Sequence, residues 1–262
     1  MSANLPIQET LTAKIAPWRA ILGFPVADLG YGEGLTLLAD RIRSKAYTPV
    51  TFLNAHNANV ALTDERFAEA LDHFLILSDG IGVDIASRAF HGATFKANLN
   101  GTDLVPALFS YCTEPLKVAL LGARPQVIGL ARDTFAHETP WHSFHIISDG
   151  YFKDADIPEI KAKLKALKPD VLLVAMGVPR QEEFIAESLG ADYCTMPMAI
   201  GALLDLHTGT IPRAPLWVRR MRSEWAYRLT REPKRLWKRY IVGNPQFIWR
   251  VARNWMAGIS AS

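Results

Sequence analysis

Short apolar runs alternate along the chain with longer stretches in which apolar residues recur every three or four positions. The apolar runs predict strands at 20–26, 49–54, 74–78, 117–122, 144–148, 171–177 and 193–201. The periodic stretches predict helices at 32–45, 64–73, 82–90, 102–112, 125–137, 157–167 and 180–189. Strands that are apolar on both faces and alternate with helices are typical of a parallel sheet covered by helices. The pattern therefore predicts an α/β fold with a mostly parallel sheet.

Polar residues and glycines cluster where the predicted strands end. In parallel sheets of this kind, ligands bind beyond the carboxyl ends of the strands. Six strand ends carry a glycine, a carboxylate or an amide: Asn54, Asp79-Gly80, Gly122, Asp149-Gly150, Gly177 to Gln181, and Gly201. Turn chemistry alone would explain one such residue, whereas six together favour a shared ligand cleft.

Charge and tryptophan content divide the chain into two parts. Residues 1–212 hold 17 Lys/Arg and 24 Asp/Glu, a net charge of −7. Residues 213–262 hold 12 Lys/Arg and two Asp/Glu, a net charge of +10, together with five of the seven tryptophans. We therefore expect a catalytic domain over 1–212 and a basic C-terminal appendage over 213–262.

The cysteines and the lack of long apolar segments indicate the compartment in which the protein works. Cys112 and Cys194 lie far apart and without the spacing of metal ligands, which indicates structural thiols in a reducing compartment. The N-terminus lacks the apolar segment of a signal peptide, and no run of 18 apolar residues is present to span a bilayer. We expect a cytoplasmic protein.

The segment 79–82 is the first candidate for chemistry. It fails as a dinucleotide fingerprint, because the third glycine would fall at Ile85 and the carboxylate of Asp79 would face a pyrophosphate. A carboxylate held at a strand end can instead take a proton from an attacking hydroxyl, while the glycines allow a substrate to approach closely. Capping of the helix that starts near Gly82 is the alternative role for Asp79.

The segment 177–182 is a more specific signal. A glycine-led turn that enters a helix with Pro179 in its first turn presents free backbone N–H groups, which suit an anion. Arg180 and Gln181 would add donors to a phosphate or a sugar, although an ordinary turn is the alternative. His56 lies in a polar loop after a strand and is either a substrate contact or a surface histidine.

Metal binding is not expected. Asp154-Ala155-Asp156 has the D-x-D pattern by which many sugar transferases hold a metal, but it directly precedes a helix start, and capping explains it better. His142 and His145 have no partner carboxylates at metal spacing.

The basic appendage contains an amphipathic pattern after Pro233. Leu236, Trp237, Tyr240 and Ile241 recur at helical spacing, and the remaining positions are Lys or Arg. This pattern is typical of a helix that lies on an anionic membrane surface. A helix packed on the catalytic domain is the alternative. Nucleic acid is disfavoured, because residues 1–212 are acidic and no nucleic-acid motif is present.

Seven segments resemble, in order and spacing, the WecG/TagA/CpsF family, which is glycosyltransferase family 26. The resemblance runs from about residue 20 to about residue 240. The segments that carry it are 52–57 (FLNAHN), 79–83 (DGIGV), 98–103 (NLNGTD), 149–152 (DGYF), 177–182 (GVPRQE), 213–215 (RAP) and 224–229 (EWAYRL).

The resemblance implies a Rossmann-like body and an inverting transferase that needs no metal or other cofactor. It implies a UDP-sugar donor and an acceptor saccharide linked to polyprenyl diphosphate. It also implies an appendage that meets the membrane and helps to complete the site. From the basic pattern after Pro233, we expect this contact to be with anionic lipid at the inner face of the plasma membrane. The amino-acid sequence at 52–56 and 98–103 is most similar to that of members that make exopolysaccharide. A homo-oligomer is left open by the sequence.

The resemblance also assigns roles to residues. It makes Asp79 the catalytic base and matches Gln181, Asp205, Arg228 and Arg235 to family positions. The sequence departs from the family at Phe52, where many members have threonine, and at Asn98, where many have arginine. With the strand-end residues, the predicted substrate-binding set is Thr51, Asn54, His56, Asn98, Asn100, Thr102, Asp103, Gly122, Gly177, Pro179, Arg180, Gln181, Gly201, Asp205, Arg228 and Arg235.

Two other functions fit parts of the sequence. A nucleotide-cleaving hydrolase or phosphotransferase would use the same cleft and would turn over without a lipid acceptor. A non-catalytic scaffold of a polysaccharide assembly complex would bind membranes through residues 213–262 without binding UDP.

Overall fold

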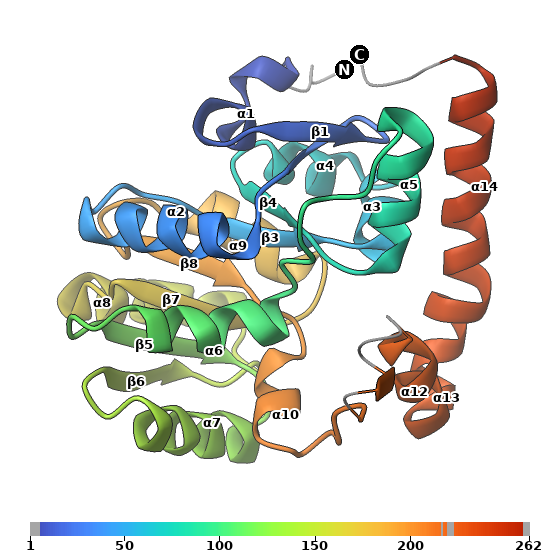
Figure 1. Cartoon of the computed structure of the whole chain (residues 1–262). Helices are drawn as coiled ribbons and strands as arrows, with labels where there is room; N and C mark the ends of the chain where they lie inside the picture. Colours follow the sequence, from blue (N-terminus) through green and yellow to red (C-terminus); the bar gives the residue numbers. More distant parts are fainter. Residues whose placement is uncertain (1–5, 216, 219–222, 259–262) are drawn as a thin grey trace.

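The protein contains one eight-stranded sheet in the order β1-β2-β4-β3-β8-β7-β5-β6 (Figure 1). The computed structural model describes residues 6–215, 217–218 and 223–258. The strands are β1 (Trp18–Ile21), β2 (Phe24–Ala27), β3 (Val50–Leu53), β4 (Leu75–Ser78), β5 (Lys117–Gly122), β6 (Ser143–Ser148), β7 (Val171–Ala175) and β8 (Met196–Ala199). Only the pairing of β1 with β2 is antiparallel among these described strands, and the others are parallel. The α/β fold with a mostly parallel sheet is confirmed.

The predicted strand over 20–26 is wrong, because a tight turn divides it into β1 and β2. Leu22 and Gly23 both have positive φ, at 52° and 91°. Two consecutive residues in this region form the two-residue turn that joins antiparallel strands. Leucine rarely adopts this conformation, so the apolar run concealed the turn.

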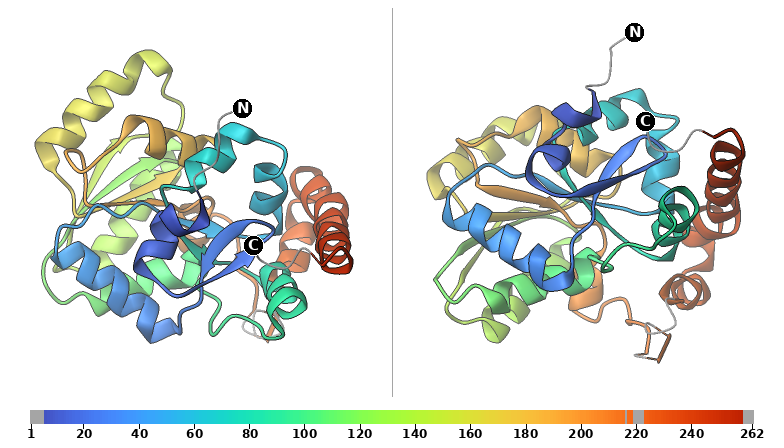
Figure 2. Two further views of the ribbon diagram at one scale, coloured as in Figure 1. Left: turned by 90° about the horizontal axis from the view of Figure 1, so that it is seen from above. Right: turned by 45° about the horizontal axis from the view of Figure 1, so that its top comes forward.

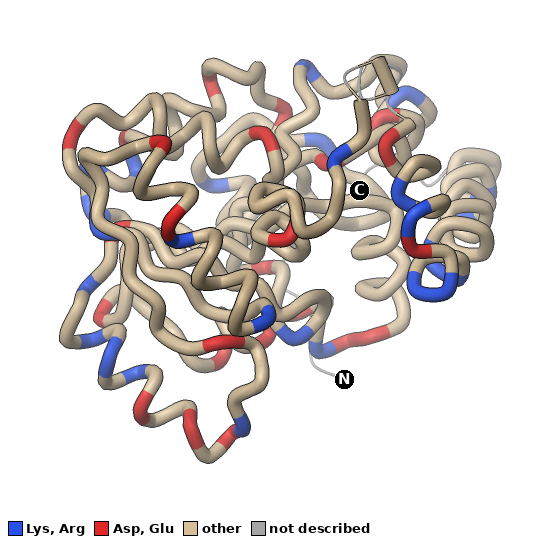
Figure 3. Tube along the Cα trace, turned by 90° about the horizontal axis from the view of Figure 1, so that it is seen from below, with Lys and Arg blue, Asp and Glu red and all other residues tan. Residues whose placement is uncertain are grey.

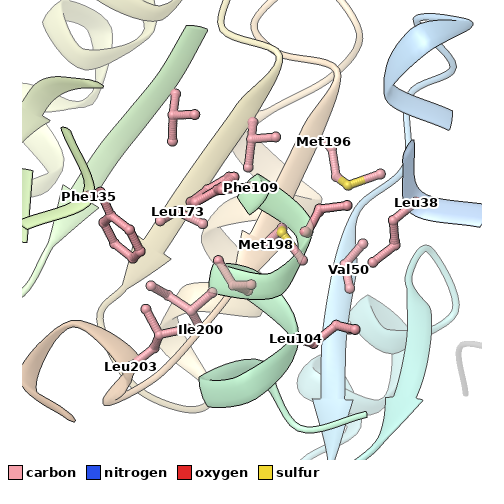
Figure 4. Packing of buried hydrophobic residues seen from close by; sticks show 14 of the residues in the cluster. Leu38, Val50, Leu104, Phe109, Phe135, Leu173, Met196, Met198, Ile200 and Leu203 are labelled. Carbon is pink, nitrogen blue, oxygen red and sulfur yellow. The ribbon is translucent and has the colours of Figure 1, made fainter. Parts of the chain in front are cut away.

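Helices cover both faces of the sheet (Figure 2). The first face carries α1 (Leu11–Ile15), α2 (Tyr31–Arg43), α6 (Gly101–Tyr111) and α7 (Pro125–Glu138), whose apolar side chains form one core cluster with the strands. Figure 4 shows this cluster, in which Leu38, Leu104 and Phe109 approach Val50 and Met198 from the helices. The opposite face carries α3 (Ala55–Ala61), α4 (Glu65–Leu71), α5 (Ile81–His91), α8 (Ile157–Leu167) and α9 (Arg180–Ser188).

Helix α3 was missed by the sequence pattern. Its residues are mostly polar or small, and the sequence therefore predicted a loop around His56. The side chain of Asn54 accepts hydrogen bonds from the N–H groups of His56 and Asn57, at 3.0 and 3.1 Å. This cap starts the helix directly at the end of β3, so His56 lies in its first turn.

The C-terminal part of the described chain is helical. The short helix α10 (Leu203–His207) precedes it, and α12 (Glu224–Arg231), α13 (Pro233–Trp237), a turn of π-helix at Lys238–Val242 and α14 (Gly243–Met256) follow. Helix α14 lies alongside α3 and α5 at the side of the sheet (Figures 1 and 2). None of the helices in the described part of the chain combines the length and hydrophobicity needed to cross a bilayer.

The predicted single apolar face after Pro233 divides into two. Leu236 and Tyr240, one helical turn apart, are buried at 3% and 8% exposure. Trp237 and Ile241 are the next residues along the chain and are exposed. One pair therefore packs inward, and the other pair faces solvent.

Candidate active site

The carboxyl ends of five neighbouring parallel strands, β4, β3, β8, β7 and β5, meet at one edge of the sheet. Two adjoining cavities of about 510 and 500 Å³ open along this edge. The strand-end cavity is lined by Gly177, Gln181, Gly201, Asp205 and other residues that follow the strands. The appendage-side cavity lies between α5 and the C-terminal helices. Its apolar lining is Ile81, Ile85, Trp225, Tyr240, Phe247 and Ile248.

The two cavities share a set of walls in which polar residues predominate. The shared residues are Asn54, His56, Asp79, Asn100, Thr102, Leu206, Arg228 and Arg239. Asp79 follows β4 directly, and its backbone N–H donates to the carbonyl oxygen of Leu53 at 2.9 Å, which continues the β3–β4 pairing. The sheet therefore fixes the one shared carboxylate in the described chain at the junction of the cavities.

Neighbouring amides hold Asp79 in place. Asn54 donates from Nδ2 to Oδ2 of Asp79 at 3.1 Å, while its own Oδ1 caps α3. Asn98 accepts from the N–H of Gly80 at 2.9 Å. The N-cap of α5 is Gly80, with φ of 90°, and no side chain caps this helix. Asp79 therefore lines both cavities and does not serve as the cap of α5.

The surroundings of Asp79 set its proton affinity. Burial raises the pKa of its carboxyl group, whereas the hydrogen bond from Asn54 and the positive charges of Arg239 and Arg228 lower it. A carboxyl group with a raised pKa is a stronger base, as long as it is ionised at the pH of the reaction. Burial of the His56 ring and the charge of Arg239 lower the pKa of this histidine to about 4. His56 is therefore neutral at pH 7.

Arg239 is a site residue that the sequence did not single out. The helical pattern assigned it to the charged outer face of its helix. In the structure it is partly buried and lines both cavities. Burial lowers the pKa of its guanidinium group. The buried Nε atoms of Arg239 and Arg228 have no hydrogen-bond partner among the residues that the structure describes. Two arginines that line the cavities beside Asp79 thus each have a buried Nε–H group without a partner in the described chain.

A second group of predicted residues lies at the start of α6. Asn100 caps this helix by accepting from the N–H of Asp103 at 3.0 Å. Asp103 also forms an ion pair of 2.6 Å with Arg213, at the beginning of the appendage. A Cβ atom at Gly101 would lie 2.9 Å from the ring of Phe52. Gly101 therefore accommodates the phenylalanine by which this chain departs from the family pattern.

Four predicted residues lie outside the walls of the two cavities. Thr51, Gly122, Pro179 and Arg180 do not line either cavity. Arg180 donates to the carbonyl oxygens of Gly150 and Phe152, at 3.4 and 3.0 Å, and so holds the loop after β6. At Gly122, with φ of 109°, a Cβ atom would lie 2.4 Å from the carbonyl oxygen of Ala175, so only glycine fits there.

Thr51 and Gln181 belong to one buried network. The hydroxyl group of Thr51 donates to Oε1 of Glu182 at 3.0 Å, and Nε2 of Gln181 donates to the same atom at 3.0 Å. Oε1 of Gln181 accepts from the N–H groups of Gly177 and Gly201, both at 3.1 Å. The N–H of Gly177 is thus used within the protein, although the sequence suggested that it is free for an anion.

The other predicted site residues line at least one cavity. They are Asn54, His56, Asp79, Asn98, Asn100, Thr102, Asp103, Gly177, Gln181, Gly201, Asp205, Arg228 and Arg235. Arg124 joins them and donates to Asp205 at 3.0 Å. It follows the strand end at Gly122 by two residues, so the strand-end rule would have found it if applied two residues further.

The remaining polar candidates have local roles. His142 accepts from the N–H of Leu116 at 3.1 Å and contacts the carbonyl oxygen of Phe109 at 2.9 Å. Asp156 accepts from the N–H of Lys153 at 2.8 Å, in the short 3-10 turn Asp154–Asp156 that leads into α8. Across the described ranges, no three His, Cys, Asp or Glu side chains gather closely enough to hold a metal ion.

Residues 19–260 match the glycosyl transferase WecG/TagA/CpsF family. The chain is 30% identical over 202 residues to the N-acetylglucosaminyldiphosphoundecaprenol N-acetyl-beta-D-mannosaminyltransferase of Bacillus subtilis (strain 168), covering 76% of this chain and 77% of the relative. The enzyme of the same name from Bacillus spizizenii is 32% identical over 196 residues, covering 74% of each chain. That of Staphylococcus aureus (strain MW2) is 29% identical over 202 residues, covering 76% of this chain and 78% of the relative.

Proposed function

The chain belongs to the WecG/TagA/CpsF family of glycosyl transferases, and from this premise we propose that it transfers a hexosyl group from a UDP-sugar to a saccharide carried on a polyprenyl diphosphate. The observation that carries the proposal is the position of Asp79, the shared carboxylate at the junction of two cavities of different chemistry. A transferase needs two substrates to meet at one base, and this arrangement provides the meeting point.

The strand-end cavity suits the nucleotide. It follows the carboxyl ends of parallel strands, where nucleotides bind in doubly wound sheets. Its walls are glycine-rich at Gly177 and Gly201 and carry hydrogen-bonding groups from Asp205 and Arg124. We assign the uridine and the donor diphosphate to this cavity.

The appendage-side cavity suits the lipid-linked acceptor. Its apolar wall is formed by α5 and the appendage, with Ile85, Trp225 and Phe247 among its residues. Apolar surface of this kind binds hydrocarbon by excluding water. The relatives are named for an acceptor that carries a sugar on undecaprenyl diphosphate, and a prenyl chain needs such a wall. We assign the acceptor to this cavity, with its reacting hydroxyl near Asp79.

The reaction then proceeds as a single displacement. Asp79 takes the proton of the acceptor hydroxyl as its oxygen forms a bond to the anomeric carbon of the donor sugar. The bond from that carbon to the β-phosphate oxygen breaks, and UDP leaves with the electron pair. Attack opposite the leaving group inverts the anomeric configuration. The raised pKa of Asp79 supports its role as the base.

Arginines offset the charge of the diphosphates in this mechanism. Arg228 and Arg239 line both cavities, and Arg235 lines the strand-end cavity. Guanidinium groups bind phosphate oxygens through paired N–H donors. We propose that these cations stabilise the departing UDP without a metal ion or another cofactor.

The appendage also provides a surface for the membrane. Trp237, Ile241, Trp249, Trp255 and Met256 are between 46% and 74% exposed. Lys and Arg follow the same helices, as Figure 3 shows. Aromatic and basic side chains together favour the interface of an anionic bilayer, at about 1 kcal/mol for each nearby cation. We propose peripheral attachment to the inner face of the plasma membrane, where the lipid-linked acceptor lies.

The product belongs, in this proposal, to an exopolysaccharide, a capsule or a related cell-surface glycan. The two segments that resemble exopolysaccharide-type members, 52–56 and 98–103, both contribute cavity walls, at His56 and Asn98 for example. The relatives are named for transfer of N-acetylmannosamine. UDP-N-acetylmannosamine is therefore the first donor to test, in a panel of UDP-sugars that includes UDP-glucose.

Calorimetry and a transfer assay on the intact protein test the proposal. UDP and the panel of UDP-sugars are titrated with a chelator present, and the best donor is then incubated with N-acetylglucosamine on a short prenyl diphosphate. We expect UDP to bind, and the sugar to reach the lipid only when both substrates are present. A folded protein that binds no uridine nucleotide would refute the donor assignment. Release of free sugar at the same rate without acceptor would indicate a hydrolase.

A further inference from the structure

A carboxylate without accessible surface lies behind the strand-end cavity. Glu182 is 0% exposed, in the first turn of α9. Its Oε1 accepts from Thr51 and Gln181, and its Oε2 is buried without a hydrogen-bond partner in the described chain. The transfer mechanism makes no use of this group. Burying a carboxylate is costly, so its retention calls for a role.

The network allows the amide of Gln181 one orientation. Its Oε1 receives two backbone N–H groups, from Gly177 and Gly201. A flipped amide would direct its NH₂ group at these two donors and its carbonyl oxygen at the carboxylate of Glu182. All three contacts would then be mismatched. The two backbone donors and the acceptor at Glu182 Oε1 therefore select the observed orientation together.

The orientation of this amide determines how the strand ends are held. Gly177 follows β7 and Gly201 follows β8, and both line the strand-end cavity. The oxygen of Gln181 joins their N–H groups, and Thr51 brings β3 to the same carboxylate. These strands are neighbours in the sheet. One carboxylate thus connects the body of β3 with the ends of β7 and β8, behind the proposed nucleotide site.

We propose that Glu182 is a positioning residue, which fixes the amide of Gln181 so that Gly177 and Gly201 are held at the separation that the ligand in the strand-end cavity requires. In naming that ligand as the uridine nucleotide, the inference rests on the proposed function. It adds that Thr51 acts through Glu182 and not by touching the sugar.

Two substitutions, Glu182→Gln and Glu182→Met, distinguish a positioning role of Glu182 from a role that only fills space. Glu182→Gln keeps an acceptor at the place of Oε1 and resembles the protonated acid at Oε2. Burial raises the pKa of Glu182 to about 7, so the neutral acid is accessible near neutral pH. Glu182→Met has similar length but offers no comparable acceptor. A purely space-filling role would make the two variants alike.

The test measures the amide resonances of Gly177 and Gly201 by NMR and the affinity for UDP by calorimetry, in the intact protein. In Glu182→Met we expect both resonances to move upfield together and UDP affinity to fall about tenfold, the effect of losing a hydrogen bond to a charged group. Glu182→Gln is expected to restore both resonances and to bind UDP within about twofold of the unmodified protein, because the acceptor is kept.

Other outcomes have defined meanings. Unmoved glycine resonances in Glu182→Met would overturn the inference, even if UDP binds well. Moved resonances in a protein that never binds UDP would support positioning and refute the proposed ligand. If Glu182→Met does not fold, Thr51→Val takes its place, with Thr51→Ser as the control that keeps the hydroxyl group. Thr51→Val should move the same two resonances by a smaller amount, and unmoved resonances would again overturn the inference.

Discussion

The sheet edge and the C-terminal appendage face each other across the cavities, and they are held in place by different means. The residues of β3, β4, β7 and β8 are all buried. Their exits are fixed by hydrogen bonds such as those of Gln181 and Asn54. Helix α12, in contrast, has no fully buried residue in the described chain, and α13 has only Leu236.

The appendage depends on a few anchors. Phe247 is fully buried, next to Gly82 and Ala55. Asn59 donates to the carbonyl oxygen of Gly243 at 2.7 Å and accepts from Arg250 at 3.0 Å. The group that needs exact placement, Asp79, thus stands on the rigid region. Arg228, Arg235 and Arg239, which we propose to offset the charge of the diphosphates, stand on the region with fewer fixed contacts. This division would suit the proposed lipid-linked substrate, which has to enter the site.

The largest effect is expected at the rigid region, from Asp79→Asn. Asparagine has the same shape and keeps the contact with Asn54 but takes no proton. We expect transfer to fall about 100- to 10,000-fold, the usual contribution of a general base, with UDP affinity nearly unchanged. Single-turnover transfer and calorimetry measure the two quantities. Near-normal turnover in a folded Asp79→Asn protein would remove the base from this residue.

Phe247→Ala tests whether the appendage is the separable region. Loss of a fully buried phenylalanine costs about 3–5 kcal/mol, and here the cost should fall on docking of α14. We expect hydrogen exchange and proteolysis to increase over 223–256 while the strands stay protected. Trp255→Ala is the matched control, since Trp255 is 61% exposed. Equal loss of protection in β3 and β8 would show that the two regions unfold as one unit.

How far sequence predicted this arrangement also differs between the two regions. The apolar runs located six of the eight strands, β3 to β8, because strands buried on both faces leave a direct signal. The pattern failed at Leu22, where an apolar residue occupies a turn, and at α3, where Asn54 starts a helix of polar and small residues. Local apolar periodicity does not register a side-chain cap or a left-handed leucine.

The strand-end rule predicted most of the rigid half of the cavity walls. It located Asp79, Gly177 and Gly201, because parallel strands bring their ends together whatever lies between them in sequence. It did not separate wall residues from residues outside the walls, such as Gly122 and Arg180. Arg239 was missed for another reason. Its direction depends on how the appendage packs against a domain far away in sequence, and helical periodicity around Pro233 carries no information on that packing.

A third prediction concerns the pH dependence of the rigid region. Burial raises the folded-state pKa of Glu182 to about 7, from an ordinary value of 4.5. Between these pH values the folded protein binds more protons at this group than the unfolded chain, so stability falls as pH rises. The loss is about 3 kcal/mol at most and is complete above pH 7.

Denaturant unfolding of the unmodified protein and of Glu182→Gln, from pH 4.5 to 8, measures this loss. The variant cannot ionise at this position, so its stability relative to the unmodified protein should increase with pH and then level off. A difference that is constant across the range would show that Glu182 keeps an ordinary pKa in the fold.

The smallest effect is expected where the two regions meet, from the charge that Arg239 places near Asp79. Arg239→Met removes a buried cation that lowers the pKa of Asp79, so the base should be protonated at higher pH. The acid limb of the pH–rate profile should therefore move to higher pH, and transfer at pH 7 should fall about 10- to 100-fold through loss of a charge-assisted contact.

Arg235→Met is the matched control, because Arg235 is exposed and pairs with Glu232. It should weaken UDP binding without moving the acid limb. A profile that moves equally in both variants would mean that the appendage acts on Asp79 through its overall charge, and a profile that moves in neither would mean that the sheet edge sets the proton affinity of its base alone.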